Sequence, residues 1–228
     1  MATARLALES LLRDRKLDST LTSARPWVAE PEDRIAPAGI PGIGSEGGLR
    51  RGHLSEIVGS RSSGRTTILC GLLAAVTGAG EVVAFIDTCD RFDPASAADA
   101  GVDLSRLLWI RERGDAARAL KAVNLVVQAG GFGLVAFDLA DVPSMAVRQF
   151  PHTTWMRLSR VIEGSQTALV LLGADHIARS PGGITVALRD DGGPRAPRGR
   201  WSGTADRARR LATLDIHPRV IGMLNAEC

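Results

Sequence analysis

The sequence predicts an α/β fold in which a mostly parallel, twisted sheet is covered by helices on both faces, with an antiparallel extension at its C-terminal side. Two observations favour this fold. Short apolar segments rich in β-branched residues alternate with helical segments of about 10–15 residues, the pattern of a buried parallel sheet. A glycine-rich loop at residues 59–67 also joins the first of these strands to the first core helix. With 228 residues, the chain is long enough for one such domain with appended ends.

The elements of the core follow one another without an internal repeat. Strands are predicted over residues 53–58, 82–87, 134–138 and 168–172, and helices over residues 66–77, 116–129 and 153–163. After residue 173 the alternation ends, because strand-like segments at 184–188 and 211–216 have no helix of comparable length between them. We expect these two segments to extend the sheet. Residues 190–203, rich in proline and glycine, are expected to form a loop.

The two ends of the chain differ in composition from the core, which we place at residues 49–189. Residues 1–48 combine a predicted amphipathic helix with a linker rich in proline and glycine. The apolar stripe of that helix includes Leu8, Leu11 and Leu12, which either contact a partner or pack on the chain itself. Residues 190–228 are predicted to hold an arginine-rich loop, the last strand and a tail.

Arginine is concentrated near the C-terminus, although the net charge of the chain is only +3. This end is a candidate for contact with DNA phosphates or with an acidic partner. The alternative is a solvated tail in a chain that has few lysines. The arginines in question are Arg195, Arg198, Arg200, Arg207, Arg209 and Arg210.

Composition and spacing exclude several classes of protein. No apolar stretch approaches the roughly 20 residues that cross a bilayer, and the start of the chain lacks the pattern of a secretory leader. The three cysteines are far apart and show neither zinc nor redox spacing. We therefore expect a soluble cytoplasmic protein with free thiols, no metal site and no membrane partner.

The glycine-rich loop has the sequence and context of a phosphate-binding P-loop. It follows a predicted strand and opens a predicted helix, so its backbone N–H groups and the helix N-terminus would face an anion. Gly59 and Gly64 hold the glycine positions, Thr66 stands where a hydroxyl would bind magnesium, and Thr67 follows it. Arg65 stands where the pattern has lysine. Because arginine is larger and planar, we expect nucleotide turnover to be weak or absent.

A second acid follows an apolar strand, as in a Walker B segment. Residues 134–137 are apolar and Asp138 comes directly after them. An apolar strand ending in an acid is common by itself, but its place after a P-loop makes it more specific. Asp138 is therefore a candidate for orienting a magnesium ion.

Taken together, these segments resemble the bacterial RecA recombinase family. The stretch SEIVGSRSSGRTT at residues 55–67 is similar to that family's strand and P-loop. AFID at 84–87, FDP at 92–94 and GVD at 101–103 also occur at RecA spacing. The likeness covers roughly residues 48–188. It implies a RecA-like core.

The chain differs from the RecA family at several of that family's functional positions. Cys89 stands at the place of the catalytic glutamate, and Ser96 at the place of the adenine-stacking tyrosine. Asp175 replaces an amide that senses the γ-phosphate, and an acid there is unfavourable beside an anion. The two DNA-binding loops of the family also look short. These departures imply a non-catalytic homologue with lost-function positions at Cys89, Ser96 and Asp175.

Among such homologues, the chain looks most similar to the ImuA group of accessory proteins in mutagenic repair. That resemblance implies a role in translesion synthesis during the SOS response to DNA damage, with RecA or an error-prone polymerase as partner. Two alternatives stay open. One is a slow ATPase that still binds ATP and magnesium weakly, with Asp90 standing in for the lost glutamate. The other is a DNA-binding regulator that uses the C-terminal arginines.

Overall fold

A computed structural model of the chain describes residues 35–38, 48–178, 182–188, 198–202, 210–215 and 218–221. All of these residues belong to one compact unit, residues 34–228. The predicted N-terminal helix with Leu8, Leu11 and Leu12 lies outside the described residues, as do Arg195, Arg207 and Arg209.

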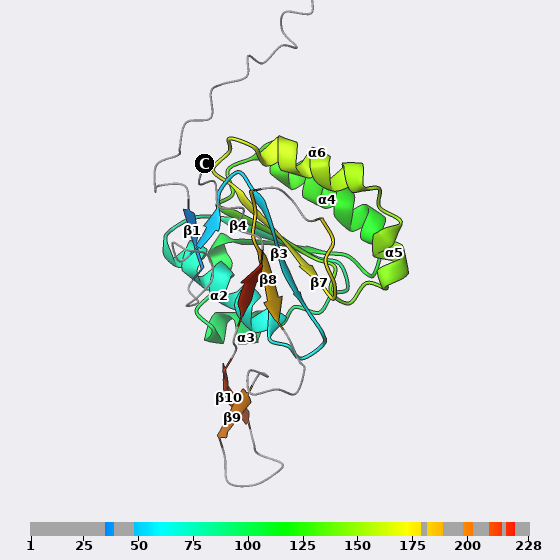
Figure 1. Cartoon of the computed structure of the whole chain (residues 1–228). Coiled ribbons are helices and arrows are strands. Elements are labelled where there is room, and N and C mark those ends of the chain that lie inside the picture. The colour runs from blue at the N-terminus through cyan, green and yellow to red at the C-terminus, as the bar shows by residue number, and fades with distance from the viewer. Residues whose placement is uncertain are drawn as a thin grey trace, which may run out of the picture. The chain divides into compact units, whose positions relative to one another are not determined.

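The centre of the fold is a seven-stranded sheet of order β11-β8-β3-β7-β6-β4-β5 (Figure 1). Its strands are β3 (Leu54–Gly59), β4 (Val83–Asp87), β5 (Leu107–Arg111), β6 (Leu134–Asp138), β7 (Ala168–Gly173), β8 (Thr185–Leu188) and β11 (Arg219–Ile221). Every pairing is parallel except that of β11 with β8. The predicted parallel sheet with an antiparallel extension is thus confirmed.

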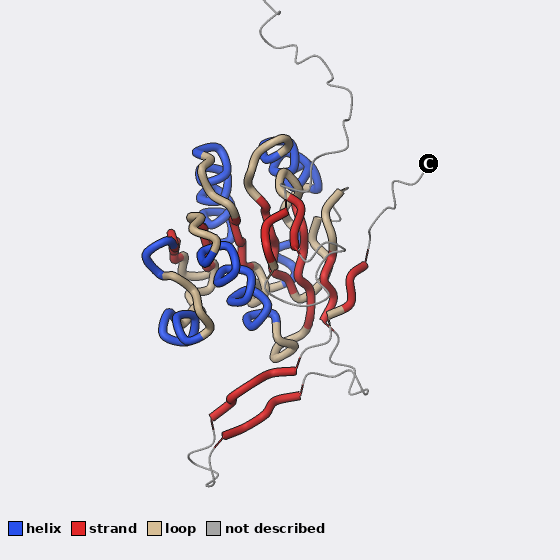
Figure 2. The backbone as a smooth tube through the Cα atoms, turned by 90° about the vertical axis from the view of Figure 1, so that its left-hand side faces the viewer, coloured by secondary structure: helices blue, strands red, loops and turns tan. Residues whose placement is uncertain are grey.

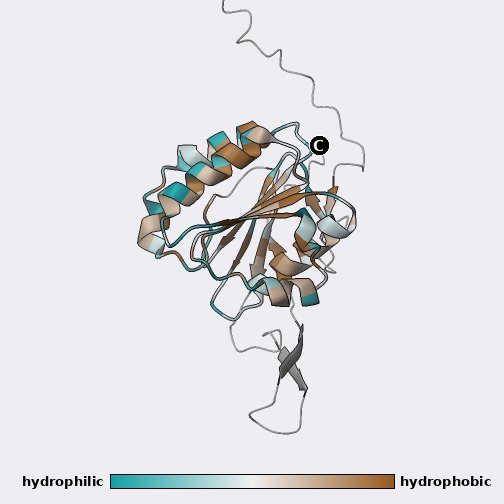
Figure 3. Cartoon of the chain, turned by 180° about the vertical axis from the view of Figure 1, so that it is seen from behind, coloured by the Kyte–Doolittle hydropathy of each residue, from teal (hydrophilic) through white to brown (hydrophobic). Residues whose placement is uncertain are grey.

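Helices cover both faces of this sheet. In Figure 1, α2 (Arg65–Gly78) and α3 (Pro94–Asp99) lie on one side, and α4 (Ala116–Ala129) and α6 (His152–Ile162) on the other. A short helix, α5 (Ser144–Arg148), precedes α6, and a 3-10 turn, η3 (Leu104–Arg106), precedes β5. Figure 3 shows hydrophobic strands in the middle of this arrangement, and hydrophilic and hydrophobic residues side by side along the helices. The α/β class follows directly from these layers.

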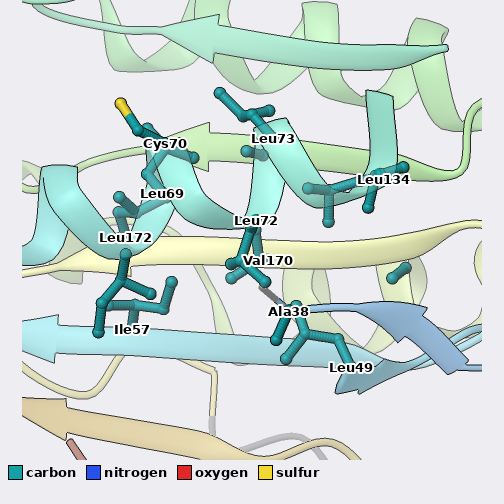
Figure 4. Close-up of a cluster of buried hydrophobic side chains, with 14 of the residues drawn as sticks. Ala38, Leu49, Ile57, Leu69, Cys70, Leu72, Leu73, Leu134, Val170 and Leu172 are labelled. Atoms are coloured by element: carbon teal, nitrogen blue, oxygen red, sulfur yellow. The ribbon is translucent and has the colours of Figure 1, made fainter. Parts of the chain in front are cut away.

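Two apolar cores result, one on each face of the sheet. Figure 4 shows the first, in which Leu69, Leu72 and Leu73 of α2 pack on Ile57 and Val170 of the central strands. The second core joins α4 and α6 to the opposite face of the sheet, with Trp155 of α6 buried in it. Side chains alternate between the two cores along each strand, as period-two geometry requires.

The segment before the core contributes a small sheet of its own. β1 (Ile35–Pro37) pairs antiparallel with β2 (Gly48–Arg50), and Ala36 and Ala38 are fully buried. Gly48 is required in this register, because a Cβ atom there would lie 2.2 Å from the carbonyl oxygen of Ala36. The sequence predicted only a linker here, since three-residue strands carry too few side chains to form a recognisable pattern.

The C-terminal part differs from the prediction in two ways. Within the predicted loop at 190–203, residues Arg198–Ser202 form strand β9, which pairs with β10 (Arg210–Asp215) in a separate two-stranded sheet (Figure 2). The predicted strand at 211–216 therefore does not extend the central sheet, whose antiparallel edge is β11 instead. Strand propensity marks a segment as extended but does not choose its partner, because pairing depends on the rest of the fold. Arg198, Arg200 and Arg210 lie in β9 and β10.

No helix within the described ranges is long and apolar enough to cross a lipid bilayer.

Candidate phosphate-binding site

The phosphate loop connects β3 to α2 at the carboxyl-terminal edge of the sheet. Its turn places Ser62 and Gly64 in the left-handed region, with φ values of 61° and 98°. Alternation of right- and left-handed residues turns successive backbone N–H groups toward one point, which is a geometry that binds anions. Gly59 is also required, because a Cβ atom there would lie 2.5 Å from Ser63 Oγ and 2.8 Å from the carbonyl oxygen of Leu188.

The N-terminus of α2 is open to a ligand. Gly64 is the N-cap and supplies no side-chain acceptor, and the first turn carries no acidic residue. The first N–H groups of a helix need an acceptor from outside the helix, and its dipole favours a negative one. Thr66 and Thr67 are exposed beside this end of the helix. An anionic oxygen would satisfy these donors.

Three buried polar atoms around the loop lack a hydrogen-bond partner in the described part of the chain: Ser63 Oγ, Arg65 Nη1 and Thr88 Oγ1. Arg65 is only 8% exposed, so its guanidinium lies within the site instead of extending into solvent. An unpaired buried donor costs about 1–3 kcal/mol. Such groups are chemically suited to an anionic oxygen at the loop.

Asp138 lies next to Asp87 on neighbouring strands, in register at the ends of β6 and β4. Burial raises the pKa of Asp138 to about 6, and the charges of Asp87 and Asp141 act in the same direction. The N–H of Ala140, 2.8 Å from Asp138 Oδ1, and the charge of Arg65 oppose this increase in the pKa. The charge of Arg65 thus acts on Asp138, the two residues that the sequence analysis assigned to this site.

Asp87 organises the loop that follows β4. It is fully buried and accepts hydrogen bonds from the backbone N–H groups of Arg91 (3.0 Å) and Phe92 (2.9 Å), and from Trp109 Nε1 (3.3 Å). A buried carboxylate with several donors is strongly localised. Asp87 is thus bound to its own loop and ring cluster.

Cys89, at the position of the catalytic glutamate in the resemblance, lies in this loop and is partly buried. Burial raises the pKa of its thiol, and the negative charges of Asp138, Asp141 and Asp87 raise it further. The thiol is therefore neutral at pH 7. A neutral thiol does not deprotonate a water molecule as a carboxylate does.

Asp90 is turned toward β5. Its two carboxylate oxygens accept a bidentate pair of hydrogen bonds from Arg111, at 2.7 Å and 2.8 Å. The hydrogen bond from Arg111 lowers the pKa of Asp90, and the guanidinium also lies 4.5 Å from the ring centre of Trp109. The alternative in which Asp90 replaces the lost glutamate is not supported by this geometry.

Asp141 connects the loops around the site. Its Oδ1 lies 3.3 Å from Arg61 Nε in the phosphate loop, and its Oδ2 lies 3.8 Å from Arg91 Nε in the loop after β4. Both arginines are largely exposed, so these ion pairs contribute little to stability. They do bring the two guanidinium groups and the carboxylate of Asp141 together beside the phosphate loop. The sequence did not predict this arrangement.

The other two positions at which the chain departs from the RecA pattern, Ser96 and Asp175, lie apart from these groups. Ser96 belongs to the first turn of α3, where its N–H donates to the N-cap carboxylate of Asp93 at 3.1 Å. Asp175 is exposed after β7 and lines a small cavity of about 60 Å³ together with Arg148 and His176. Neither side chain therefore takes part in the cluster formed by Arg65, Cys89 and Asp138.

A buried acid that sequence reasoning missed anchors the segment after β7. Glu56, in the middle of β3, accepts hydrogen bonds from the N–H groups of Ile177 (2.9 Å) and Ala178, and its Oε2 lies 3.5 Å from His176 Nδ1. The signal was present, because an acid inside an apolar strand needs internal partners when it is buried. This carboxylate holds the short segment that stands at the position of the second DNA-binding loop in the resemblance.

The fold and the loop define a P-loop α/β protein, and comparison with known proteins gives its relationship. Residues 39–148 match the model of the RecA N-terminal domain family. Protein RecA of Borrelia hermsii (strain HS1 / DAH) is 37% identical over 92 residues, which is 40% of this chain and 26% of that protein. Protein RecA of Mycobacterium ulcerans (strain Agy99) is 38% identical over 92 residues, with the same shares of 40% and 26%.

Protein RecA of Frankia alni is 35% identical over 113 residues, or 50% of this chain and 32% of that protein. This chain is therefore RecA-like in its matched region. It spans between 26% and 32% of the length of these relatives. A crystal structure of the RadB recombinase superposes with a TM-score of 0.43 at 18% identity, covering 55% of this chain and 63% of that chain.

Proposed function

We propose that this chain is a non-catalytic, RecA-like accessory protein of bacterial DNA damage tolerance. It acts in translesion synthesis through protein contacts with RecA, with an error-prone polymerase complex, or with both. The relationship to RecA supports a role in DNA repair, and the resemblance to the ImuA group supports the particular setting. On this proposal, the phosphate loop is retained as part of the fold and is not an active site.

The single observation that carries the proposal is the lack of a free carboxylate where the attacking water would be activated. Cys89 has a neutral thiol at that position, and both oxygens of the adjacent Asp90 are bound to Arg111. Asp138 is nearby and ionised at neutral pH, but on this proposal it stands where the family's magnesium-orienting acid would be, and not where the base would be. Positioning of phosphates without a base gives little turnover.

The test combines an ATPase assay with a binding assay. We expect the purified chain to hydrolyse ATP at the same background rate as its Thr66→Ala variant, with and without single-stranded DNA. We also expect it to co-purify with RecA or with a polymerase subunit of the damage response. Turnover that Thr66→Ala abolishes would contradict the non-catalytic assignment, and failure to bind either partner would contradict the accessory role.

A second candidate function, nucleotide binding without turnover, is favoured by the three unpaired polar atoms at Ser63, Arg65 and Thr88. These groups fit an anionic phosphate oxygen. The Thr66 hydroxyl and Asp138 would hold the magnesium ion that shields the phosphates when bound. Arg65 would contact phosphate through its planar fork.

Titration with a fluorescent ATP analogue in the presence of magnesium tests this second candidate. Binding at the loop predicts that Arg65→Ala weakens the affinity at least about tenfold, because one charge-assisted hydrogen bond contributes roughly 1.5–3 kcal/mol. The exposed Arg148, outside the loop, gives a matched control as Arg148→Ala. Equal affinities for all three proteins would place any binding elsewhere.

A further inference from the structure

A groove separate from the phosphate site runs along one side of α6. Its volume is about 520 Å³, and it lies between α6, the start of β3 near Leu54, and the backbone at Ala178 and Gly182. Binding pockets for ligands commonly measure about 300–1,000 Å³. The groove is at the amino-terminal end of β3, whereas the phosphate loop follows the carboxyl-terminal end of the same strand. The two sites are thus at opposite edges of the sheet.

The shape of the groove follows the helix. Its α6 side includes His152, Met156, Arg160 and Glu163, which recur at spacings of three and four residues and therefore lie on one side of the helix. At about 1.5 Å per residue, this row extends for roughly 16 Å. An elongated groove of that length suits a short peptide segment better than a compact small molecule.

The floor of the groove is apolar, and the flexible hydrophobic side chain of Met156 forms part of its rim. Leu54, Ala178 and Trp155 are buried beneath it, Trp155 with only 3% of its surface exposed. Met156 on the rim is 46% exposed. Methionine adapts its shape to different partners and is frequent in surfaces that bind peptides. An apolar anchor residue would therefore find contacts on both the floor and the rim.

The charged groups on the rim indicate which type of residue beside the apolar anchor would fit the groove. Arg160 makes no hydrogen bond or ion pair within the described ranges of the chain, and Glu163 is the only acid that lines the groove. His53 is held by the contact between its Nδ1 and the carbonyl oxygen of Arg51, at 3.0 Å, and its ring lies against Gly182. Cationic and histidine groups thus outnumber the single carboxylate, and an acidic side chain would pair with Arg160.

We propose that this groove binds a short segment of a partner protein in which an apolar anchor residue is followed or preceded closely by an acidic residue. The site would be one of the contact surfaces of the accessory protein, so the inference rests on the proposed function. It adds the location on the chain and the chemistry of the segment that is recognised.

The experiment is a selection of random 12-residue displayed peptides on the full-length chain, followed by affinity measurements with fluorescent copies of the recovered peptides. We expect the recovered peptides to carry Asp or Glu within a few positions of a large apolar residue. Met156→Glu and Arg160→Glu should each weaken binding at least about tenfold, the loss expected from one buried anchor or one charge-assisted pair.

Two variants at exposed positions outside the groove are matched controls. Met145→Glu changes a methionine that is 71% exposed on α5, and Arg157→Glu changes an exposed arginine of α6; neither residue lines the groove. Both should bind the peptides as the unchanged chain does. In a charge swap, replacing the acidic residue of the peptide by arginine should restore binding to Arg160→Glu. All four changes are at exposed positions, and circular dichroism checks that each variant is folded.

Four results would overturn the proposal: no enriched peptide, enriched peptides that lack an acidic residue, equal losses in the groove variants and the controls, or recovery only of small anionic compounds from a parallel ligand screen. The outcome is independent of the ATPase and RecA-binding assays. A failure of the accessory role in those assays can therefore be told apart from a failure of the groove to bind peptides.

Discussion

The effect of Asp138 on stability tests the electrostatics described for the phosphate site. The carboxyl group is partly buried beside Asp87, and its pKa is raised from 3.8 to about 6. Asp138→Asn removes the charge, keeps the shape, and leaves an amide oxygen to accept the hydrogen bond from the Ala140 N–H. We expect the variant to be more stable than the unchanged chain at pH 7.5.

The sign follows from linkage between proton binding and folding. Because the pKa of Asp138 is higher in the folded state, the folded chain binds the proton more tightly than the unfolded chain between pH 4 and 6. The stability contributed by the protonated group is complete below about pH 4 and is lost as the pH rises through about 6. At pH 7.5 the ionised group therefore destabilises the fold.

The size of the effect comes from the same pKa values. The difference between 3.8 and about 6, at 1.36 kcal/mol for each pH unit, sets an upper limit of about 3 kcal/mol. Partial exposure of the carboxyl group allows water to screen its charge, so we expect a gain of about 1–2 kcal/mol. For a chain of this length, that gain corresponds to a rise in Tm of roughly 2–8 °C.

The assay is urea unfolding followed by tryptophan fluorescence at pH 4.5, 6.0 and 7.5. The gain in free energy of unfolding at pH 4.5 should be roughly a third of its value at pH 7.5, because a carboxyl group with a pKa of 3.8 in the unfolded chain is already largely ionised at pH 4.5. Asp175→Asn is the control, since Asp175 is exposed, and it should have no effect at any of these pH values. No gain in stability at pH 7.5, or an equal gain at all three pH values, would contradict a raised pKa of Asp138 in the folded chain.

Three further predictions concern stability and the segment after β7. Arg51→Met removes a partly buried bidentate pair with Glu81, at 2.7 Å and 2.8 Å, and should lower the free energy of unfolding in urea by about 3 kcal/mol; the same change at the exposed Arg157 should lower it by under about 0.5 kcal/mol. Leu72→Ala should cost about 3 kcal/mol, because Leu72 is fully buried, and a cost under 1 kcal/mol would contradict the core described here. Glu56→Gln should speed hydrogen exchange at residues 177 and 178, and unchanged rates would show that the carboxylate does not hold this segment.

Local signals made most of the central elements predictable. The helix at 116–129 and the strand at 134–138 have the predicted bounds, because each carries a complete period of apolar residues. The phosphate loop was also predictable, since the positive φ values of Ser62 and Gly64 belong to a turn with a recognisable sequence. Such patterns depend on near neighbours alone.

The candidate site was predictable only in part. Arg65 and Asp138 were identified from their places after two strands, and parallel pairing brings those strand ends to one edge. The bidentate pair of Asp90 with Arg111, and the burial of Arg65 with an unpaired nitrogen, were not visible in the sequence. They depend on side-chain directions and on which strand lies next to β4.

By itself, the sequence determined the α/β class and the phosphate loop, because both depend on the types and spacing of residues that are close together in the chain. Only the tertiary structure decided that β11, and not the segment at 210–215, completes the central sheet. It also decided that Glu56 anchors the segment at 176–178 and that α6 borders a groove. Strand partners, buried ion pairs and cavities arise from contacts between residues far apart in the chain, and periodicity carries no information about them.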